Sequence, residues 1–331
     1  MLAKKIASGA LWFVGGRLST RARPRLAVAS SSMAGPSETT VPKPTTSENL
    51  VIVRAGPNSL HPHWFTPEEA KFDLLVAAYN PHAPSATGEW RIDVPGTKVA
   101  GFGKLFDLHP EIFDRYQRIA LIDDDIMTNS SDLNSLFRLG QEFQLEIWQP
   151  SLSHDSFFTY AITVQNRLYI LRYTDYVEMM CPFFKASALR NIKPLFSEGY
   201  ESGMDLIWSE MRLANSRKLA IIDAISVKHT RPVGKLRTDQ GFDAVEGYIP
   251  VIHAFLKKKN LTFRYPAVIG GILNLNGIKI GRKVTSISQI LLVKSVGKTP
   301  HSLKYIGRAL YHHFGFGAGK RARVTREDVR P

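Results

Sequence analysis

The chain has 331 residues, 44% of them hydrophobic and 22% charged, which is the composition of a globular protein with room for one large or two modest domains. Its formal net charge is +14, but the positive excess lies at the ends: residues 1–37 hold six basic and no acidic residues, and residues 251–331 hold sixteen basic and two acidic ones. Residues 38–250 carry 27 acidic and 21 basic residues. An acidic central region argues against nucleic acid as a partner, whereas the basic ends suit an anionic membrane surface.

The ends of the chain and its single cysteine bound the domain organisation. Residues 1–49 are predicted to be a disordered basic leader and a Pro-, Ser- and Thr-rich linker, residues 50–250 a catalytic domain, and residues 251–331 a basic extension. The apolar stretch at residues 6–16 is too short to span a bilayer, which needs about 20 residues. Cys181 alone excludes an internal disulfide and fits a reducing compartment. We therefore expect no transmembrane helix and a soluble or peripheral membrane protein, with the cytoplasm favoured.

Short apolar runs that end in turn residues alternate with helical patterns along the predicted domain. Strands are predicted at residues 50–53, 72–79, 98–101, 118–122, 145–148 and 219–222, and a hairpin at 160–164 and 168–173. Helices are predicted at 102–115, 132–143 with Ser130 or Ser131 as N-cap, 185–192, 204–215, 287–293 and 303–310. This alternation indicates an α/β fold with a mixed, mainly parallel, doubly wound sheet flanked by helices.

An acidic triplet, Asp123-Asp124-Asp125, follows the clearest buried strand, at the edge where open α/β sheets bind ligands. In extended backbone, Asp123 and Asp125 point to one side and Asp124 to the other. Two carboxylates on one side predict a site for Mn²⁺ or Mg²⁺, which would stabilise the charge on a nucleoside diphosphate leaving group. The alternative is an acidic turn that precedes a helix; position alone does not separate the two.

A second fold also places Asp-x-Asp after a hydrophobic strand, namely that of the haloacid-dehalogenase-like phosphohydrolases. Those enzymes have Thr or Val two positions after the second aspartate, where this chain has Met127, and Thr128 comes one position later. Their motif also follows the first strand, whereas at least two predicted strands come earlier here. The phosphohydrolase is therefore the second choice among enzymes.

The residues around the triplet resemble the family called domain of unknown function 707, which is thought to be glycosyltransferase-like. Seven segments carry the resemblance in order, namely Gly96-Thr97-Lys98, Leu108-His109-Pro110, 116–125, 145–150, 178–182, Gly203-Met204-Asp205 and 227–232 around His229. The resemblance implies a GT-A-like fold and the transfer of a sugar from a nucleotide-sugar donor to an unknown glycan, lipid or protein acceptor. Plant members usually carry an amino-terminal membrane anchor, and no span of that length is found here.

The resemblance also implies roles for two single residues. Asp205, in the first turn of a predicted helix, is the candidate base that takes the acceptor's proton, and the alternative is an ordinary acidic residue at a helix start. His229 is a candidate third metal ligand, and the alternative is a surface histidine.

Further candidates follow from position along the predicted sheet. Contacts to the nucleotide and its diphosphate are predicted for Asn80, Lys104 and Asp124, and contacts to the sugar or acceptor for Gln149, Glu178 and Trp208. The sequence thus predicts a metal-dependent glycosyltransferase. A non-catalytic sugar- or anion-binding scaffold remains the alternative from another class.

Overall fold

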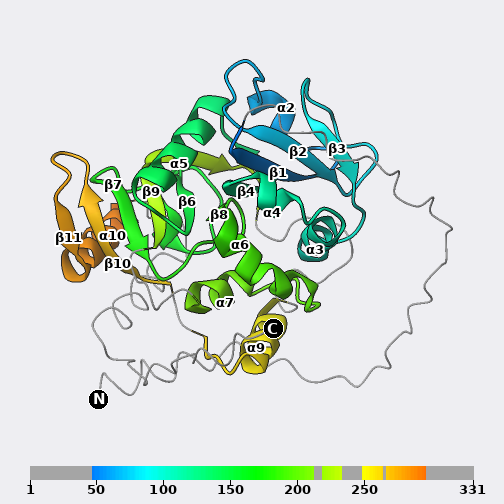
Figure 1. Ribbon diagram of the computed structural model, residues 1–331. Coiled ribbons are helices and arrows are strands. Elements are labelled where there is room, and N and C mark those ends of the chain that lie inside the picture. Colours follow the sequence, from blue (N-terminus) through cyan, green and yellow to red (C-terminus); the bar gives the residue numbers. More distant parts are fainter. Residues whose placement is uncertain (1–46, 212–217, 233–247, 264–265, 296–331) are drawn as a thin grey trace. The chain divides into compact units, whose positions relative to one another are not determined.

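The computed structural model describes residues 47–211, 218–232, 248–263 and 266–295. They form an α/β fold built on an 11-stranded sheet (Figure 1). The strands are β1 (Asn49–Ala55), β2 (Asp73–Ala78), β3 (Trp90–Asp93), β4 (Arg118–Asp123), β5 (Ile126–Met127), β6 (Ile147–Leu152), β7 (Tyr169–Thr174), β8 (Phe183–Lys185), β9 (Leu219–His229), β10 (Val268–Leu273) and β11 (Lys279–Gly281). The helices are α2 (His61–Trp64), α3 (Lys98–Leu108), α4 (Ile112–Arg115), α5 (Ser130–Glu142), α6 (Ala186–Ile192), α7 (Met204–Met211), α9 (Tyr248–Lys258) and α10 (Arg282–Ser295), with 3-10 turns η1 (Ala161–Thr163) and η2 (Lys193–Ser197).

The sheet runs in the order β11-β10-β7-β9-β6-β8-β4-β1-β2-β3, and β5 pairs with the end of β9. Pairing is parallel from β3 through β2 and β1 to β4, and again between β6 and β9. The remaining pairs in the described residues are antiparallel. The predicted α/β class, with a mixed sheet flanked by helices, is confirmed, although the parallel part is one half of the sheet rather than most of it.

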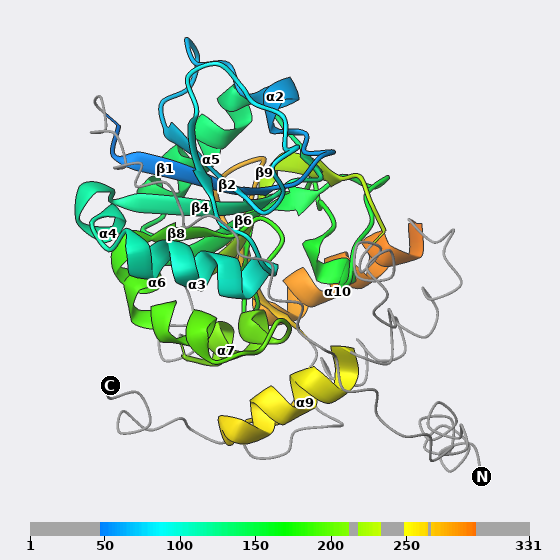
Figure 2. The ribbon, with the colours of Figure 1, turned by 90° about the vertical axis from the view of Figure 1, so that its right-hand side faces the viewer.

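Alternate side chains of the central strands enter two separate cores, one on each face of the sheet. Figure 2 shows helices on both faces, with α3, α6 and α7 below the central strands and α2 above them. Leu50 and Ile52 of β1 pack with residues of α3, α6 and α7. Val51 and Val53 pack on the other face with residues of α2 and α5. Burial on both faces explains why these strands read as continuous apolar runs in the sequence.

Several predicted elements differ from the structure. Residues 98–101 begin helix α3 and are not a strand, and residues 160–164 contain turn η1 in place of the first arm of a hairpin. Helix α5 is capped by Asn129, whose side chain accepts a hydrogen bond from the backbone of Asp132. Strand β6 continues past Pro150, where its pairing with β9 shifts register, as proline in a sheet requires. The predicted leader, up to residue 46, and the predicted helix at 303–310 lie outside the described residues.

The sheet also continues beyond residue 250, where the predicted catalytic domain ends. Strand β10 pairs with β7, and α10 packs against β10 and β11 (Figure 1). The first part of the predicted extension is thus hydrogen-bonded into the same sheet as the triplet strand; the boundary itself stays a prediction. Among the described residues, no helix has the length and apolarity needed to cross a bilayer.

Candidate active site

The acidic triplet lies at the carboxyl ends of β1 and β4, where the chain order of the sheet changes direction. From β1 the sheet continues to β2 and β3 on one side and to β4 on the other. A doubly wound sheet binds its ligand in the crevice at such a switch point. Asp123 ends β4 and lies opposite Arg54 of β1 in the parallel register, so the fold puts the triplet at this switch point.

The three aspartates contact different partners, although Asp124 and Asp125 form a turn in place of the predicted extended backbone. Asp123 contacts Lys98, and Asp125 contacts His229. Asp124 instead accepts hydrogen bonds from the backbone of Gly56 and the hydroxyl of Tyr79, each at 3.0 Å. Its other oxygen is 3.0 Å from a guanidinium nitrogen of Arg231.

Through these hydrogen bonds, Asp124 links the loops that follow β1, β2 and β9. Both of its carboxylate oxygens already accept hydrogen bonds from protein groups, and its side chain is buried. A carboxylate in that state has little remaining capacity for a ribose or phosphate contact. Its predicted contact to the nucleotide stays a prediction. In this structure its carboxylate holds the three loops in position.

Lys98, from the segment Gly96-Thr97-Lys98 of the resemblance, is the cation of the site. Its ammonium nitrogen lies 2.6 Å and 2.7 Å from the two carboxylate oxygens of Asp123. Burial raises the pKa of Asp123 to about 6, Lys98 opposes that rise, and the neighbouring Asp125 adds to it. Lys104 is exposed on α3, as a surface lysine of a helix would be, and its phosphate contact stays a prediction, whereas Lys98 lies at the triplet.

Buried Arg54 supports the segment that leads into α3, the helix that begins with Lys98. Its guanidinium donates to the carbonyl oxygen of Ala77 in β2 and to those of Val94, Gly96 and Thr97, which lie in the segment that leads into α3. A Cβ atom at Gly101 would lie 2.4 Å from the guanidinium carbon, so only glycine lets α3 pack on Arg54 at this point. Burial lowers the pKa of Arg54 to about 10, which still keeps it cationic at neutral pH.

His229 reaches the triplet because the last residues of β9 pair with β5, with Ile126 opposite His229. The backbone and the hydroxyl of Thr230 also donate to the carbonyl of Asp125. The predicted grouping of Asp125 with His229 is therefore present: the His229 Nε2 atom lies 3.3 Å from an oxygen of Asp125.

The hydrogen-bond partners of His229 favour a positive charge, either a proton or a cation, between its Nε2 atom and the carboxylate of Asp125. His229 Nδ1 lies 3.0 Å from the carbonyl of Phe157, which can only accept, so Nδ1 carries a proton. Nε2 then faces a carboxylate, and this contact is attractive only if Nε2 is protonated or shares a cation with Asp125. Burial acts to lower the pKa of His229, but Asp125 outweighs it and raises that pKa above its ordinary value.

Glu178 supplies the second unsatisfied carboxylate of the site. Its backbone amide donates to Gln149 at 2.5 Å, and the carbonyl of Met180, two residues on, accepts from the backbone of Asp123. Oε2 of Glu178, like Oδ1 of Asp125, is buried without a hydrogen-bond partner. Burial raises the pKa of Glu178 to about 7. Gln149 is itself buried and holds the Glu178 backbone, so it is a positioning residue in this structure.

Asp205 lies near Glu178 at the start of α7. It accepts hydrogen bonds from the Tyr176 hydroxyl at 2.7 Å and from the backbone of Leu206 at 3.0 Å. Burial raises its pKa, and the bond from Tyr176 opposes the rise. Both carboxylate oxygens of Asp205 therefore accept a hydrogen bond, whereas one carboxylate oxygen of Glu178 has no partner.

Two further predicted residues make other contacts in this structure. Trp208 is fully buried, donates to the carbonyl of Val177 and packs edge-on against Phe184. We correct its assignment, because a core side chain cannot contact a substrate. Asn80 follows β2 at the correct edge of the sheet, but its side chain accepts from the backbone of His82 and closes a turn. Its nucleotide contact stays a prediction.

The donor set suits a hard divalent cation with few protein ligands. No group of three or more His, Cys, Asp or Glu side chains in the described part of the chain is arranged to enclose a metal. Mg²⁺ and Mn²⁺ need no such enclosure when substrate phosphates complete the shell, because one or two carboxylates then suffice. The partnerless oxygen of Asp125 fits that requirement. Both oxygens of Asp123 contact Lys98, so Asp123 could bind a metal only if Lys98 gave up one of these contacts. The predicted metal stays a prediction.

Comparisons with known proteins give distant structural likenesses only. No family model and no curated protein matches the chain, so membership of the domain of unknown function 707 family stays a prediction. A structure of residues 1–349 of TarS from S. aureus in complex with UDP-GlcNAc is 10% identical, covers 81% of this chain and 80% of that one, and has a TM-score of 0.43. The same fragment in complex with UDP is 10% identical, with coverages of 83% and 92% and a TM-score of 0.36. A197 from STIV is 13% identical, with coverages of 55% and 84% and a TM-score of 0.32.

Proposed function

We propose that the crevice between β1 and β4 binds a nucleoside diphosphate sugar together with Mn²⁺ or Mg²⁺, and that the protein transfers the sugar to an acceptor hydroxyl on a glycan, lipid or protein. The observation that carries the proposal is the pair of buried carboxylate oxygens without partners, on Asp125, which follows β4, and on Glu178, which precedes the neighbouring strand β8. A buried polar atom without a partner is costly, and a ligand that completes the site removes that cost.

Asp123 and Asp125 would hold the cation, with His229 as a further ligand through Nε2. The cation would stabilise the negative charge on the departing diphosphate. Lys98 would add a second positive charge beside the phosphates when it exchanges part of its contact with Asp123. Asp124 and Arg54 would keep the loops after β1, β2 and β4 at fixed separations, which is the positioning that transfer to a single hydroxyl needs.

Glu178 is the best placed base. A carboxylate with a pKa near 7 is partly deprotonated at neutral pH and still basic enough to take a proton from an attacking hydroxyl. In the proposed displacement, the acceptor oxygen bonds to the anomeric carbon, its proton passes to Glu178, and the bond from that carbon to the diphosphate oxygen breaks with its electrons. Asp205, the base expected from the resemblance, would then orient Tyr176 and the wall next to Glu178.

The test is a titration of UDP and GDP with and without Mn²⁺, using the parent protein, Asp125→Asn and, as matched control, Asp114→Asn. Asp114 is an exposed acid in a surface ion pair with Arg190. Mn²⁺ should tighten nucleotide binding to the parent and to the control, and the Asp125 variant should lose at least about tenfold of that gain. Equal metal dependence in all three proteins would contradict the assignment.

Hydrolysis of nucleotide sugars separates an enzyme from a sugar- or anion-binding scaffold. Glu178→Gln should keep nucleotide binding and lower the turnover of the active donor by about a hundredfold or more, whereas Asp205→Asn should have the smaller effect. A larger loss of turnover in the Asp205 variant would instead assign the role of base to Asp205. Binding without turnover of any donor in the parent would favour the scaffold.

A further inference from the structure

Helix α10 (Arg282–Ser295) is amphipathic in the opposite sense to an ordinary helix of a globular domain. Thr285, Ser286 and Gln289 are buried, whereas Val284 and Ile287 are 57% and 48% exposed. In a domain surrounded by water, the apolar stripe of a helix faces the core and the polar face meets solvent. Within residues 282–289, the part of α10 whose side chains the structure describes, the helix therefore turns its apolar side chains outward and its polar ones inward.

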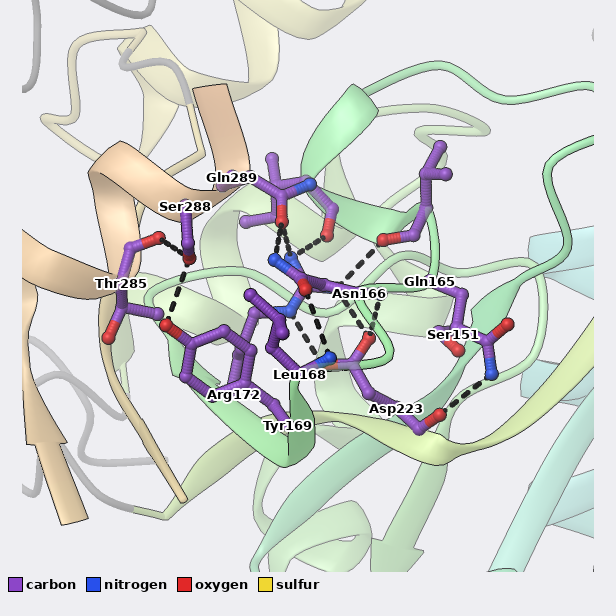
Figure 3. Close-up of polar contacts among 12 residues, drawn as sticks. Ser151, Gln165, Asn166, Leu168, Tyr169, Arg172, Asp223, Thr285, Ser288 and Gln289 are labelled. Carbon is purple, nitrogen blue, oxygen red and sulfur yellow. Dashed lines mark hydrogen bonds and ion pairs between the residues drawn. The ribbon is translucent and has the colours of Figure 1, made fainter. Parts of the chain in front are cut away.

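The polar face of α10 is held by a buried hydrogen-bond network, shown in Figure 3. The Gln289 carbonyl accepts from Arg172 at 2.7 Å, and its amide donates to the backbone of Ala161 at 2.8 Å. Arg172 is paired with the Asp223 carboxylate through two bonds, at 2.6 Å and 2.8 Å. Because buried polar groups keep their partners, α10 cannot rotate to bury its apolar face without breaking this network.

The turn between β10 and β11 presents further apolar side chains beside α10. Leu275 at the turn is 94% exposed, and Ile278 is 52% exposed. Of the eight large hydrophobic residues that are exposed in the described part of the chain, four fall between 275 and 287. A fifth, Leu168, adjoins the turn, since its carbonyl accepts from the backbone of Asn274 at 2.9 Å. This concentration makes the β10-β11 turn and α10 one apolar surface element, which we call the hairpin–helix surface.

Cations accompany the apolar side chains of the hairpin–helix surface. Lys279, Arg282 and Lys283 are exposed within it, and Arg167 is exposed beside Leu168. The sequence contains no acidic residue from 247 to 326. Exposed leucine and isoleucine with lysine and arginine among them is the composition of elements that lie in the interface of an anionic bilayer.

We propose that the hairpin–helix surface docks the protein on an anionic membrane, with Leu275, Ile278, Val284 and Ile287 entering the boundary between headgroups and acyl chains. Leu275 stands at the tip of a turn, and a protruding apolar tip can enter a lipid layer without a matching groove on a partner. The surrounding lysines and arginines meet the lipid phosphates. This inference does not rest on the proposed sugar transfer, because it uses other residues.

The experiment is co-sedimentation of the full chain with vesicles of phosphatidylcholine alone and of phosphatidylcholine with phosphatidylglycerol at 7:3. The parent should bind the anionic vesicles. The double substitution Leu275→Ser and Ile287→Ser should weaken that binding by about tenfold or more, from the apolar area kept out of the bilayer. Leu108→Ser is the matched control, since Leu108 is 55% exposed on α3 and lies outside the surface.

A second pair of substitutions tests the charge contribution. Lys279→Gln with Lys283→Gln should weaken binding by about twenty-five-fold at low salt, at about fivefold for each cation. All other basic residues of the chain ends are unchanged in these variants, so the comparison isolates the hairpin–helix surface. Circular dichroism melting and UDP binding report whether each variant keeps its fold.

Three results would overturn the inference. The first is no binding of the parent to either vesicle. The second is binding that both double variants retain in full. The third is a concentration-dependent dimer of the parent that Leu275→Ser with Ile287→Ser dissociates, because a second copy would then cover the surface.

Discussion

Glu178 makes the stability of the protein depend on pH in a way that one substitution removes. Its pKa is raised from 4.5 to about 7, chiefly because burial disfavours the charged carboxylate. Between those values the folded protein keeps a proton that the unfolded chain has released. The resulting stabilisation is fully present below pH 4.5 and is lost as the pH rises through 7, and the gap between the two pKa values corresponds to about 3 kcal/mol.

The substitution Glu178→Gln replaces the titrating carboxyl by a neutral amide of the same shape. The free energy of unfolding of the variant, relative to the parent, should therefore rise by about 3 kcal/mol between pH 4 and pH 8. Asp123 and Asp175, whose pKa values burial also raises to about 6, titrate in both proteins, so their contributions largely cancel in this comparison. Urea unfolding followed by tryptophan fluorescence at the two pH values, in buffer with a chelator, measures the difference.

Glu69→Gln serves as the control, because Glu69 is exposed. It should give the same difference from the parent at both pH values. If Glu178→Gln also gives a constant difference, the carboxyl is not held in a buried, proton-retaining environment. Its assignment as the base would then fail with it.

Two further predictions concern packing around the sheet. Arg172→Met leaves the buried Asp223 carboxylate without its cation and should lower the free energy of unfolding by about 3–5 kcal/mol in urea unfolding, whereas a change below 1 kcal/mol would mean that Asp223 is solvated. Gly140→Ala places a Cβ atom 2.2 Å from the ring of Trp148 and should lower the melting temperature although alanine favours helix, while Gly281→Ala, which meets no atom within 4 Å, should leave it nearly unchanged.

Strands β1, β2 and β4 could be predicted from the sequence to within about two residues, whereas β3 was not predicted and β6 and β9 extend well beyond their predicted ends. Strands β1, β2 and β4 are buried on both faces, so each is an unbroken apolar run between turn residues. Residues 98–101 form an equally short run, and their state is decided from far away in the chain. The carboxylate of Glu201 accepts from the backbone amides of Val99 and Ala100 and thereby supports the first turn of α3. No local pattern contains that contact.

The candidate site was predicted in part for the same reason. Asp123, Asp125 and His229 could be named because the triplet follows a clear strand and the histidine lies in a segment of the resemblance. Lys98 lies in such a segment too, but its role depends on the lateral support that Arg54 gives to α3. Trp208 was misjudged because a tryptophan near a predicted active-site helix gives no sign, in sequence, of which face it occupies.

The pairing of β10 with β7 has a consequence for biosynthesis. While the chain is being made, β7 can pair with β9 once residue 229 has been synthesised, but its other edge stays open until residues 268–273 follow. An open strand edge is a template for pairing with other chains. A nascent chain that stalls near residue 250 would expose this edge of β7 and lack Gln289, the side chain that closes the Arg172 network. Once the segment from 268 to 289 has been synthesised, this edge of β7 can be paired and is no longer open to other chains.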